Sequence, residues 1–525
     1  MEWKNMTMLN SFKALKNAAP VELKKEMAGR SGAERAETFM VPMAEGLKLN
    51  YAARPVNTEI LSILADLAKE AELSEKFAAL YNGEIVNTGE KRRVLHHLTR
   101  GQLGEDVIAD GVNKREFYLQ QLAKIRAFAD KVHSGELKNE NGDTYTTVVQ
   151  IGIGGSDLGP RAMYLALENW AKANGCFKME ARFISNVDPD DAAAVLAGTD
   201  VSRALFIVVS KSGTTLETLT NEAFVKDALI KNGLNPSMHM LAVTSATSPL
   251  AKSDEYLAAF FMDDFIGGRY SSTSAVGGAV LSLAFGYKVF EQFLAGAAAE
   301  DKLAATKPFM ENPDMIDALI GVYERNVLGM PATAVLPYSQ ALARFPAHLQ
   351  QLDMESNGKS VNRFGEKVAY VTGPEIFGEP GTNGQHSFYQ LLHQGTDVVP
   401  LQFVGFKASQ MGVDVDIQGS TSQQKLCANV AAQIMAFACG KDDINPNKNF
   451  EGNRPSSIII GKQLTPASLG ALLAHFENKV MFQCFVWNVN SFDQEGVQLG
   501  KVLAKKVLAH ETDGALKAYA ELLNI

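Results

Sequence analysis

The sequence predicts an α/β protein with two units, each built on a parallel-rich β-sheet flanked by helices. Two observations carry this prediction. Continuous apolar runs end in loops of small residues and lead into helical patterns, first at residues 144–151, 204–210 and 238–244, and again after about residue 330. Such runs are typical of strands that are buried on both faces. The length of 525 residues also favours more than one folding unit.

The elements follow in order along the chain. Residues 1–105 are rich in Ala, Leu, Glu and Lys with helical periodicity, which predicts a helical N-terminal section packed on the second unit. The first unit covers residues 106–285. The second unit covers residues 286–510, with strands expected at 332–336, 367–372, 398–404 and 457–460 and a last helix at 494–508. A C-terminal tail follows at 511–525.

Composition excludes several classes of function. The net charge of -9 and a pI near 5.6 argue against a surface that grips nucleic acid or anionic lipid. The four cysteines lie far apart with no Cys-x-x-Cys pair, so neither a disulfide framework nor a thiolate zinc site is expected. The N-terminus lacks the apolar core of a secretory signal. We expect a cytoplasmic protein that binds neither nucleic acid nor membranes.

The loop at residues 210–215, Ser-Lys-Ser-Gly-Thr-Thr, lies between a buried strand and a predicted helix. Free backbone N–H groups and the positive end of a helix dipole favour an anion at that position. The alternative is an ordinary helix cap, since Thr214 and Glu217 fit a capping box. Four hydroxyls, a glycine and a lysine in six residues exceed what capping requires. The loop therefore predicts a phosphate site.

A second loop, Gly-Ile-Gly-Gly-Ser-Asp-Leu-Gly at residues 152–159, resembles a dinucleotide-binding turn, but Asp157 stands where the last glycine is required. Two alternatives remain equal: Gly155 and Ser156 contact a ligand, or the loop is only a tight turn between a strand and a helix. Residues 358–360, Gly-Lys-Ser, resemble the end of a nucleotide-binding P-loop. Asp353 occupies the position of its first glycine, so that reading fails.

Three places offer titratable groups. Glu355 stands among small polar residues and suits a general base, although a solvated loop residue is the alternative. His386 ends a turn-dense loop at the start of a predicted helix, where an isolated surface histidine is the alternative. Gln494 and Lys501 are seven residues apart and are predicted to share a helix face, which could equally be a solvated basic face. No metal site is predicted.

Taken together and in this order, these motifs closely resemble the glucose-6-phosphate isomerase (phosphoglucose isomerase) family over nearly the whole chain. The segments that carry the resemblance lie at residues 92–97, 151–160, 210–215, 267–272, 354–359, 381–386 and 492–501. The resemblance implies two sugar-isomerase (SIS) domains, each a three-layer α/β sandwich. It also implies no metal, no cofactor, and a homodimer in which each active site takes a histidine, His386, from the partner subunit.

The resemblance also assigns a role to each matching residue in the reversible isomerisation of glucose 6-phosphate and fructose 6-phosphate. Glu355 is the base that moves a proton between C2 and C1 through a cis-enediol, and Arg269 stabilises the enediolate. His386 and Lys501 open the sugar ring. The remaining matches bind phosphate or line the site: Ser210, Lys211, Ser212 and Thr215, and Gly155, Ser156, Gln351 and Gln494.

The chain departs from the family pattern in two places. Gln498 replaces a usual glutamate beside Lys501, which changes the charge around that lysine, and the phosphate loop reads Ser-Gly where many animal members carry Thr-Phe. Two alternative functions remain open. A non-catalytic sugar-phosphate sensor would not need the set of Glu355, Arg269, His386 and Lys501, and a Schiff-base aldolase would use Lys501 as its nucleophile.

Overall fold

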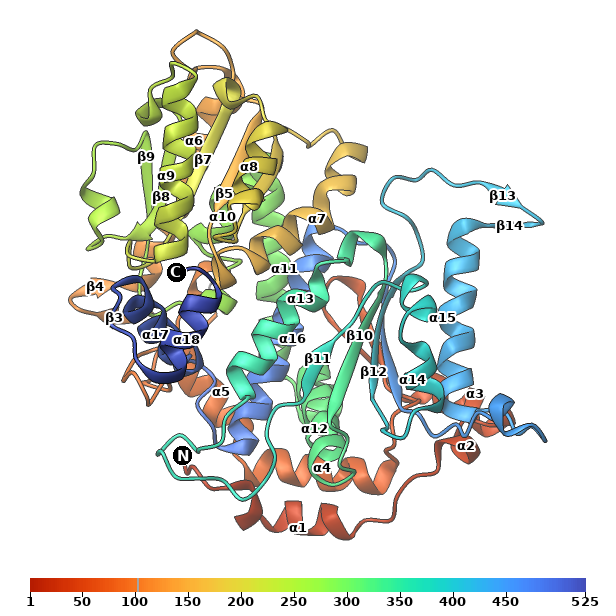
Figure 1. Cartoon of the computed structure of the whole chain (residues 1–525). Coiled ribbons are helices and arrows are strands. Elements are labelled where there is room, and N and C mark those ends of the chain that lie inside the picture. Colours follow the sequence, from red (N-terminus) through yellow and green to blue (C-terminus); the bar gives the residue numbers. More distant parts are fainter. Residues whose placement is uncertain (102) are drawn as a thin grey trace.

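The computed structural model describes residues 1–101 and 103–525. Two separate β-sheets occupy different parts of the molecule, the first in the upper part of Figure 1 and the second in the lower part. Helices cover the faces of both sheets. The predicted α/β class with parallel-rich sheets is therefore confirmed.

The first sheet has five parallel strands in the order β6-β5-β7-β8-β9. Their bounds are β5 Thr147–Ile151, β6 Glu180–Ile184, β7 Ala204–Val209, β8 Met240–Ser245 and β9 Ala258–Met262. Its helices are α6 Lys114–Ser134, α7 Leu158–Ala173, α8 Pro189–Ala197, α9 Leu216–Lys231 and α10 Ala275–Phe285. Every residue of β7 is buried, because α9 packs on one face and α10 on the other. The three apolar runs predicted as strands correspond to β5, β7 and β8.

The second sheet has six strands in the order β1-β2-β15-β12-β10-β11. The bounds are β1 Met40–Pro42, β2 Lys48–Asn50, β10 Ala332–Tyr338, β11 Glu375–Phe377, β12 Leu401–Phe406 and β15 Ser456–Gly461. The last four strands run parallel, and β2 pairs antiparallel with β15. The N-terminal section, predicted as helical, thus also contributes two short strands to this sheet.

Helices of the N-terminal section and the second unit surround this sheet. They are α1 Asn10–Asn17, α2 Leu23–Glu26, α3 Gly29–Thr38, α4 Thr58–Glu70, α5 Leu73–Tyr81, α11 Tyr287–Thr306, α12 Pro313–Asn326, α13 Phe345–Gln350, α14 Tyr389–Gln394, α15 Ser422–Cys439 and α16 Pro466–Trp487. Two small hairpins complete the list, β3 Ile108–Ala109 with β4 Val112–Asn113 and β13 Asp416–Ile417 with β14 Ser420–Thr421.

The prediction of a strand at residues 367–372 is wrong. Lys367 forms only an isolated bridge with Val361, and the strand at this edge of the sheet is β11. Side chains tether the segment instead: the Tyr370 hydroxyl donates to the carbonyl of Trp487 at 2.6 Å, and Thr372 Oγ1 donates to the carbonyl of Lys359 at 2.8 Å. The β-rich residues of this segment therefore belong to a loop that side-chain hydrogen bonds hold in place.

Helix α16 is buried along almost its whole length and packs against α11. The two helices approach closely where they carry glycine, since a Cβ on Gly470 would lie 1.9 Å from the carbonyl oxygen of Phe293. The charged residues of α16 are paired: Lys479 Nζ lies 2.8 Å from Asp317 Oδ2, and Glu477 pairs with Arg100. Breaking such a buried pair is costly, so this cluster fixes the helix in place.

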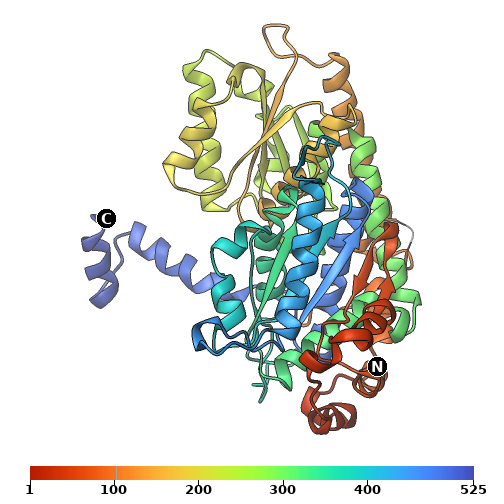
Figure 2. The same ribbon diagram turned by 90° about the vertical axis from the view of Figure 1, so that its right-hand side faces the viewer.

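The C-terminal helices α17 Gln498–Leu508 and α18 Gly514–Leu522 project away from the body of the molecule, as Figure 2 shows. Their apolar side chains are exposed, including Leu499, Val502 and Leu522. None of the helices in the described ranges is long and apolar enough to span a membrane.

Candidate active site

The loop at residues 210–215 joins the buried strand β7 to helix α9, at the carboxyl edge of a parallel sheet. This edge is where ligands bind in open α/β sheets. Thr215 immediately precedes α9, and its side chain makes no capping hydrogen bond. The capping box suggested for Thr214 and Glu217 is therefore wrong; Thr214 Oγ1 donates to Ser212 Oγ at 2.9 Å instead. The hydroxyls of the loop do not serve to cap the helix.

The hydroxyls of this loop converge around its glycine. Ser210 Oγ lies 3.1 Å from Thr215 Oγ1 and accepts from the backbone N–H of Gly213 at 3.1 Å. Gly213 has a φ of +66°, and a Cβ there would lie 2.4 Å from Ser248 Oγ. A side chain would both strain the backbone and clash, so glycine is required for this loop shape.

The turn Gly154–Ser156 lies directly against the turn that carries Arg269. A Cβ on Gly155 would fall 2.2 Å from the carbonyl carbon of Gly268. On the other side of the turn, a Cβ on Gly154 would lie 3.3 Å from Gln351 Nε2. The glycine-rich loop, Arg269 and Gln351 are thus brought together, and the close approach explains why this loop needs its glycines.

Glu355 ends a π-helical turn, Gln351–Glu355, that continues from α13. Its carboxylate Oε2 accepts from Arg269 Nη1 at 3.1 Å, and the Glu355 side chain is 24% exposed. Glu355 is therefore a partly shielded, paired carboxylate rather than a freely solvated loop residue. π-Helical turns are uncommon and often occur at functional sites.

Arg269 is almost fully buried, and each of its five N–H donors is used. The acceptors are Ser356 Oγ at 2.7 Å, Glu355 Oε2 at 3.1 Å, Gln494 Oε1 at 3.1 Å, and the carbonyl oxygens of Ser491 at 2.6 Å and Asp493 at 3.0 Å. The guanidinium stays charged and cannot rotate without breaking several of these bonds. It is a fixed positive charge beside Glu355.

A small cavity lies between Gln494 and the loop at residues 210–215. Its walls include Gln494, Tyr270, Lys211 and Asp264, and its free space is about 20 Å³. Lys211 Nζ lies 3.5 Å from Asp264 Oδ1, a partly exposed and therefore weak ion pair. Lys211 of the loop and Gln494, which accepts from Arg269, thus line the same small cavity.

A larger cavity of about 480 Å³ opens beside Glu355 and is also lined by Lys359, Asp493 and Gln494. Its size lies within the usual range for sites that hold small ligands. Lys359 Nζ donates to Asp493 Oδ1 at 2.5 Å, which leaves this wall nearly neutral. The base candidate therefore borders an open cavity large enough for a sugar phosphate.

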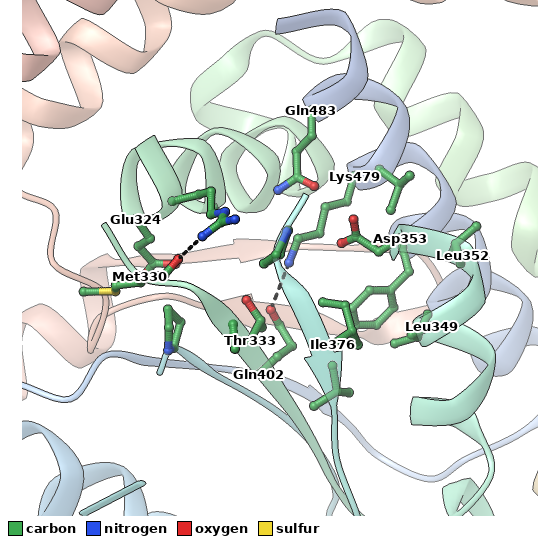
Figure 3. A pocket seen from close by; sticks show the side chains of 18 of the residues that line it. Glu324, Met330, Thr333, Leu349, Leu352, Asp353, Ile376, Gln402, Lys479 and Gln483 are labelled. Atoms are coloured by element: carbon green, nitrogen blue, oxygen red, sulfur yellow. Dashed lines mark hydrogen bonds between the residues drawn. The ribbon is translucent and has the colours of Figure 1, made fainter. Parts of the chain in front are cut away.

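Another cavity, shown in Figure 3, borders the same π-helical turn but not Glu355. Its walls include Asp353, Gln402 and Lys479, and its free space of about 30 Å³ suits roughly two water molecules. Burial raises the pKa of the Asp353 carboxyl to about 6. The cavity is too small for a hexose phosphate.

The structure does not bring His386 and Lys501 into this cluster. Both are exposed, and in the described part of the chain neither makes a hydrogen bond or ion pair with Glu355 or Arg269. His386 ends a 3-10 turn before α14 rather than starting a helix. Gln494 precedes α17 and lies outside it, so the predicted helix face shared with Lys501 is wrong.

From the sequence alone we did not identify Ser356, Ser491 and Asp493, which accept hydrogen bonds from the Arg269 guanidinium. Ser356 accepts from Arg269 Nε and lies 3.1 Å from the Tyr270 hydroxyl. Ser356 directly follows Glu355, so its place in that motif was a usable signal. Ser491 and Asp493 contact the guanidinium through backbone carbonyls, which any residue possesses, and no sequence signal marks them.

A buried cluster is formed by Glu300, Asp314 and His475, whose possible ligand atoms lie close enough together to hold a metal ion. Both ring nitrogens of His475 already face carboxylates, with Nδ1 at 2.6 Å from Asp314 Oδ1 and Nε2 at 3.3 Å from Asp317 Oδ2. Although burial alone would lower it, these carboxylates raise the pKa of His475. Both ring nitrogens of His475 are thus already engaged by carboxylates of the protein.

Comparisons with known proteins identify the family of the chain. The family model described as phosphoglucose isomerase matches residues 50–520. The chain is 63% identical to the glucose-6-phosphate isomerase of Treponema denticola, with all of both chains covered, and 58% identical to that of Treponema pallidum, covering 100% of this chain and 99% of the relative. A crystal structure of a glucose-6-phosphate isomerase from Chlamydia trachomatis superposes with a TM-score of 0.92 at 42% identity, covering 99% of each chain. The chain therefore belongs to the phosphoglucose isomerase family.

Proposed function

We propose that this protein is an enzyme that interconverts D-glucose 6-phosphate and D-fructose 6-phosphate, in glycolysis and gluconeogenesis. The observation that carries the proposal is the Glu355–Arg269 pair. Gln494, which accepts from Arg269, lines a small cavity together with Lys211 of a hydroxyl-rich loop at a helix N-terminus. An aldose and a ketose on one carbon skeleton differ only in the positions of protons and electrons. A carboxylate base and a fixed cation therefore supply the chemistry, and no redox cofactor or metal is needed.

The phosphate group binds to Ser210, Lys211, Ser212 and Thr215. The uncapped N-terminus of α9 supports this assignment, because its free N–H groups and dipole favour an anion. Gly155, Ser156, Gln351 and Gln494 line the site between the phosphate and the reacting carbons.

Glu355 removes the proton from C2 of glucose 6-phosphate and returns it to C1, which passes through a cis-enediol. Negative charge develops on the substrate oxygens during this step. Arg269 stabilises that charge, and because its five hydrogen bonds are already in place, little reorganisation accompanies the reaction.

His386 and Lys501 open the sugar ring, with His386 contributed by the partner subunit of a homodimer. The exposed position of His386 and the projecting helices α17 and α18, with their exposed apolar side chains, support a site completed by a second copy.

The location in the cytoplasm and the division of the chain at residues 105, 285 and 510 also stay predictions.

The direct experiment is an assay on fructose 6-phosphate in which released glucose 6-phosphate reduces NADP⁺ through an added dehydrogenase. The protein as a full chain should show steady turnover without any added metal or cofactor. Binding of fructose 6-phosphate without turnover would overturn the proposed activity and favour a sugar-phosphate sensor.

The shared site has its own test. Glu355→Gln and His386→Ala chains should each be inactive, but a mixed dimer contains one site with both native residues. Mixing the two variants under conditions that exchange subunits should therefore restore activity. Failure to restore it, although mass measurement shows mixed dimers, would contradict the contribution of His386 across the interface.

A further inference from the structure

Asn357 lies two residues after Glu355, and its side chain is fully buried. It is not part of the walls of the cavity that Glu355 borders. Its Nδ2 donates to the carbonyl of Val480 in α16 at 3.2 Å, and its Oδ1 accepts from Ser491 Oγ. Asn357 therefore joins the turn that carries Glu355 to two other parts of the chain.

Ser491, the partner of Asn357, is also an anchor of Arg269. The Ser491 carbonyl accepts from Arg269 Nη2 at 2.6 Å, while Arg269 Nη1 donates to Glu355. The contacts thus close a ring that runs from Glu355 through Arg269, Ser491 and Asn357 and back along the chain to Glu355. A closed ring fixes the positions of its members relative to one another more firmly than separate contacts do.

The surroundings of Asn357 leave it little freedom to move. A Cβ on Gly373 would lie 2.9 Å from the Cβ of Asn357, so that neighbouring loop packs against it without a side chain. Its backbone carbonyl accepts from the N–H groups of Lys359 at 2.8 Å and Gly373 at 3.0 Å. The side chain is held in one orientation from several directions.

We propose that Asn357 is a positioning residue, which keeps the turn bearing Glu355 and the segment anchoring Arg269 at a fixed separation. The inference rests on the isomerase function proposed above. It goes beyond it by assigning a catalytic consequence to a residue that does not line the sugar site. Proton transfer is sensitive to small displacements, and a misplacement of about 1 Å can cost roughly 100-fold in rate.

The test compares two buried asparagines. Asn357→Ala should lower kcat for fructose 6-phosphate by about 100-fold, with KM close to the wild-type value because the phosphate loop lies on other elements. Asn312 is equally buried and also accepts and donates hydrogen bonds, but it caps α12 away from the site. Asn312→Ala should lower the melting temperature and leave kcat unchanged when both variants are assayed well below melting.

Ser491→Ala keeps the carbonyl that binds Arg269 and removes only the hydroxyl that binds Asn357. It should also lower kcat, but by a smaller factor. The double variant should be no slower than Asn357→Ala, because both substitutions break the same hydrogen bond between Ser491 and Asn357. This variant carries the test if Asn357→Ala does not fold. An unchanged kcat in the folded variants, with an active wild type, would overturn the inference alone. An inactive wild type would overturn the proposed function together with it.

Discussion

The two halves of the candidate site are assembled in different ways. The phosphate half is six consecutive residues, 210–215, at one junction of a strand and a helix. In the half proposed to transfer protons, Arg269 bonds to Glu355, 86 residues away, and to Gln494, 225 residues away. The proposed phosphate binding depends on local backbone shape, whereas the proposed base and its cation meet only when distant parts of the fold are in place. Changes in the two halves should therefore affect different kinetic constants.

The largest effect is expected from Glu355→Gln. The amide keeps the shape and can still accept from Arg269, but it cannot take a proton from carbon. We expect kcat to fall by about 1,000-fold, while calorimetry shows nearly unchanged binding of fructose 6-phosphate. If Glu355→Gln lost binding but kept kcat, Glu355 would contribute to substrate binding rather than to proton transfer, and the proposed separation of the two halves would be wrong.

Arg269→Lys should have the next largest effect. Lysine keeps the charge but cannot reach five acceptors with a rigid planar group. We expect kcat to fall by about 100-fold in the same assay. Arg126, which is largely exposed on the surface of α6, provides the control. Equal losses for Arg269→Lys and Arg126→Lys would show that the fixed geometry of Arg269 is unimportant.

Thr215→Val tests the phosphate half. The change removes one hydroxyl from the group that converges at Ser210 and preserves the size of the side chain. Loss of one hydrogen bond to a charged group should raise KM by about tenfold, with kcat near the wild-type value. Thr220→Val, on the exposed side of α9, should change neither constant. A fall in kcat without a rise in KM would contradict the separation of the two halves.

The last prediction concerns the stability of the fold rather than a kinetic constant. His348 is buried, and a Cβ on Gly159 of α7 would lie 3.4 Å from its ring, so it packs where the two units meet. Burial lowers the pKa of His348 to about 4 from an ordinary value of 6.5. The unfolded chain therefore binds a proton that the folded chain does not, and this contribution to stability is lost as pH falls from 6.5 towards 4.

At pH 5 the loss amounts to about 2 kcal/mol, so the wild-type melting temperature should fall more between pH 7 and pH 5 than that of His348→Gln. Calorimetric scans of both proteins at the two pH values measure this difference. Identical pH dependence would mean that the ring of His348 is accessible to protons in the folded protein.

The sequence predicted the central strands of the fold well and its edges poorly. β5, β7 and β8 are continuous apolar runs because helices cover both of their faces. The edge strand β6 escaped notice, since its exposed side carries Glu180 and Arg182, which pair with each other at 3.0 Å. Partial burial alone does not produce a recognisable run.

A similar division applies to the site. A phosphate role for residues 210–215 was predicted from the residues of the loop itself, because the proposed binding depends on local backbone geometry, and it stays a prediction. Glu355 was a candidate general base because of its small polar neighbours, but Arg269 was identified only through the family resemblance. Nothing near either residue in the sequence reveals that they touch. The carbonyls of Ser491 and Asp493 could not be predicted at all, and neither could the separation of Gln494 from the helix that carries Lys501.

The central claim is that Glu355 moves the proton between C2 and C1. Proton NMR of sugar phosphate incubated with the enzyme in D₂O tests it most directly. Wild-type protein should interconvert the two sugars and introduce deuterium at these carbons, because a proton held on a carboxylate exchanges with solvent. Glu355→Gln should bind the sugar phosphate but show neither interconversion nor deuterium incorporation. Deuterium incorporation by Glu355→Gln at close to the wild-type rate would contradict the account.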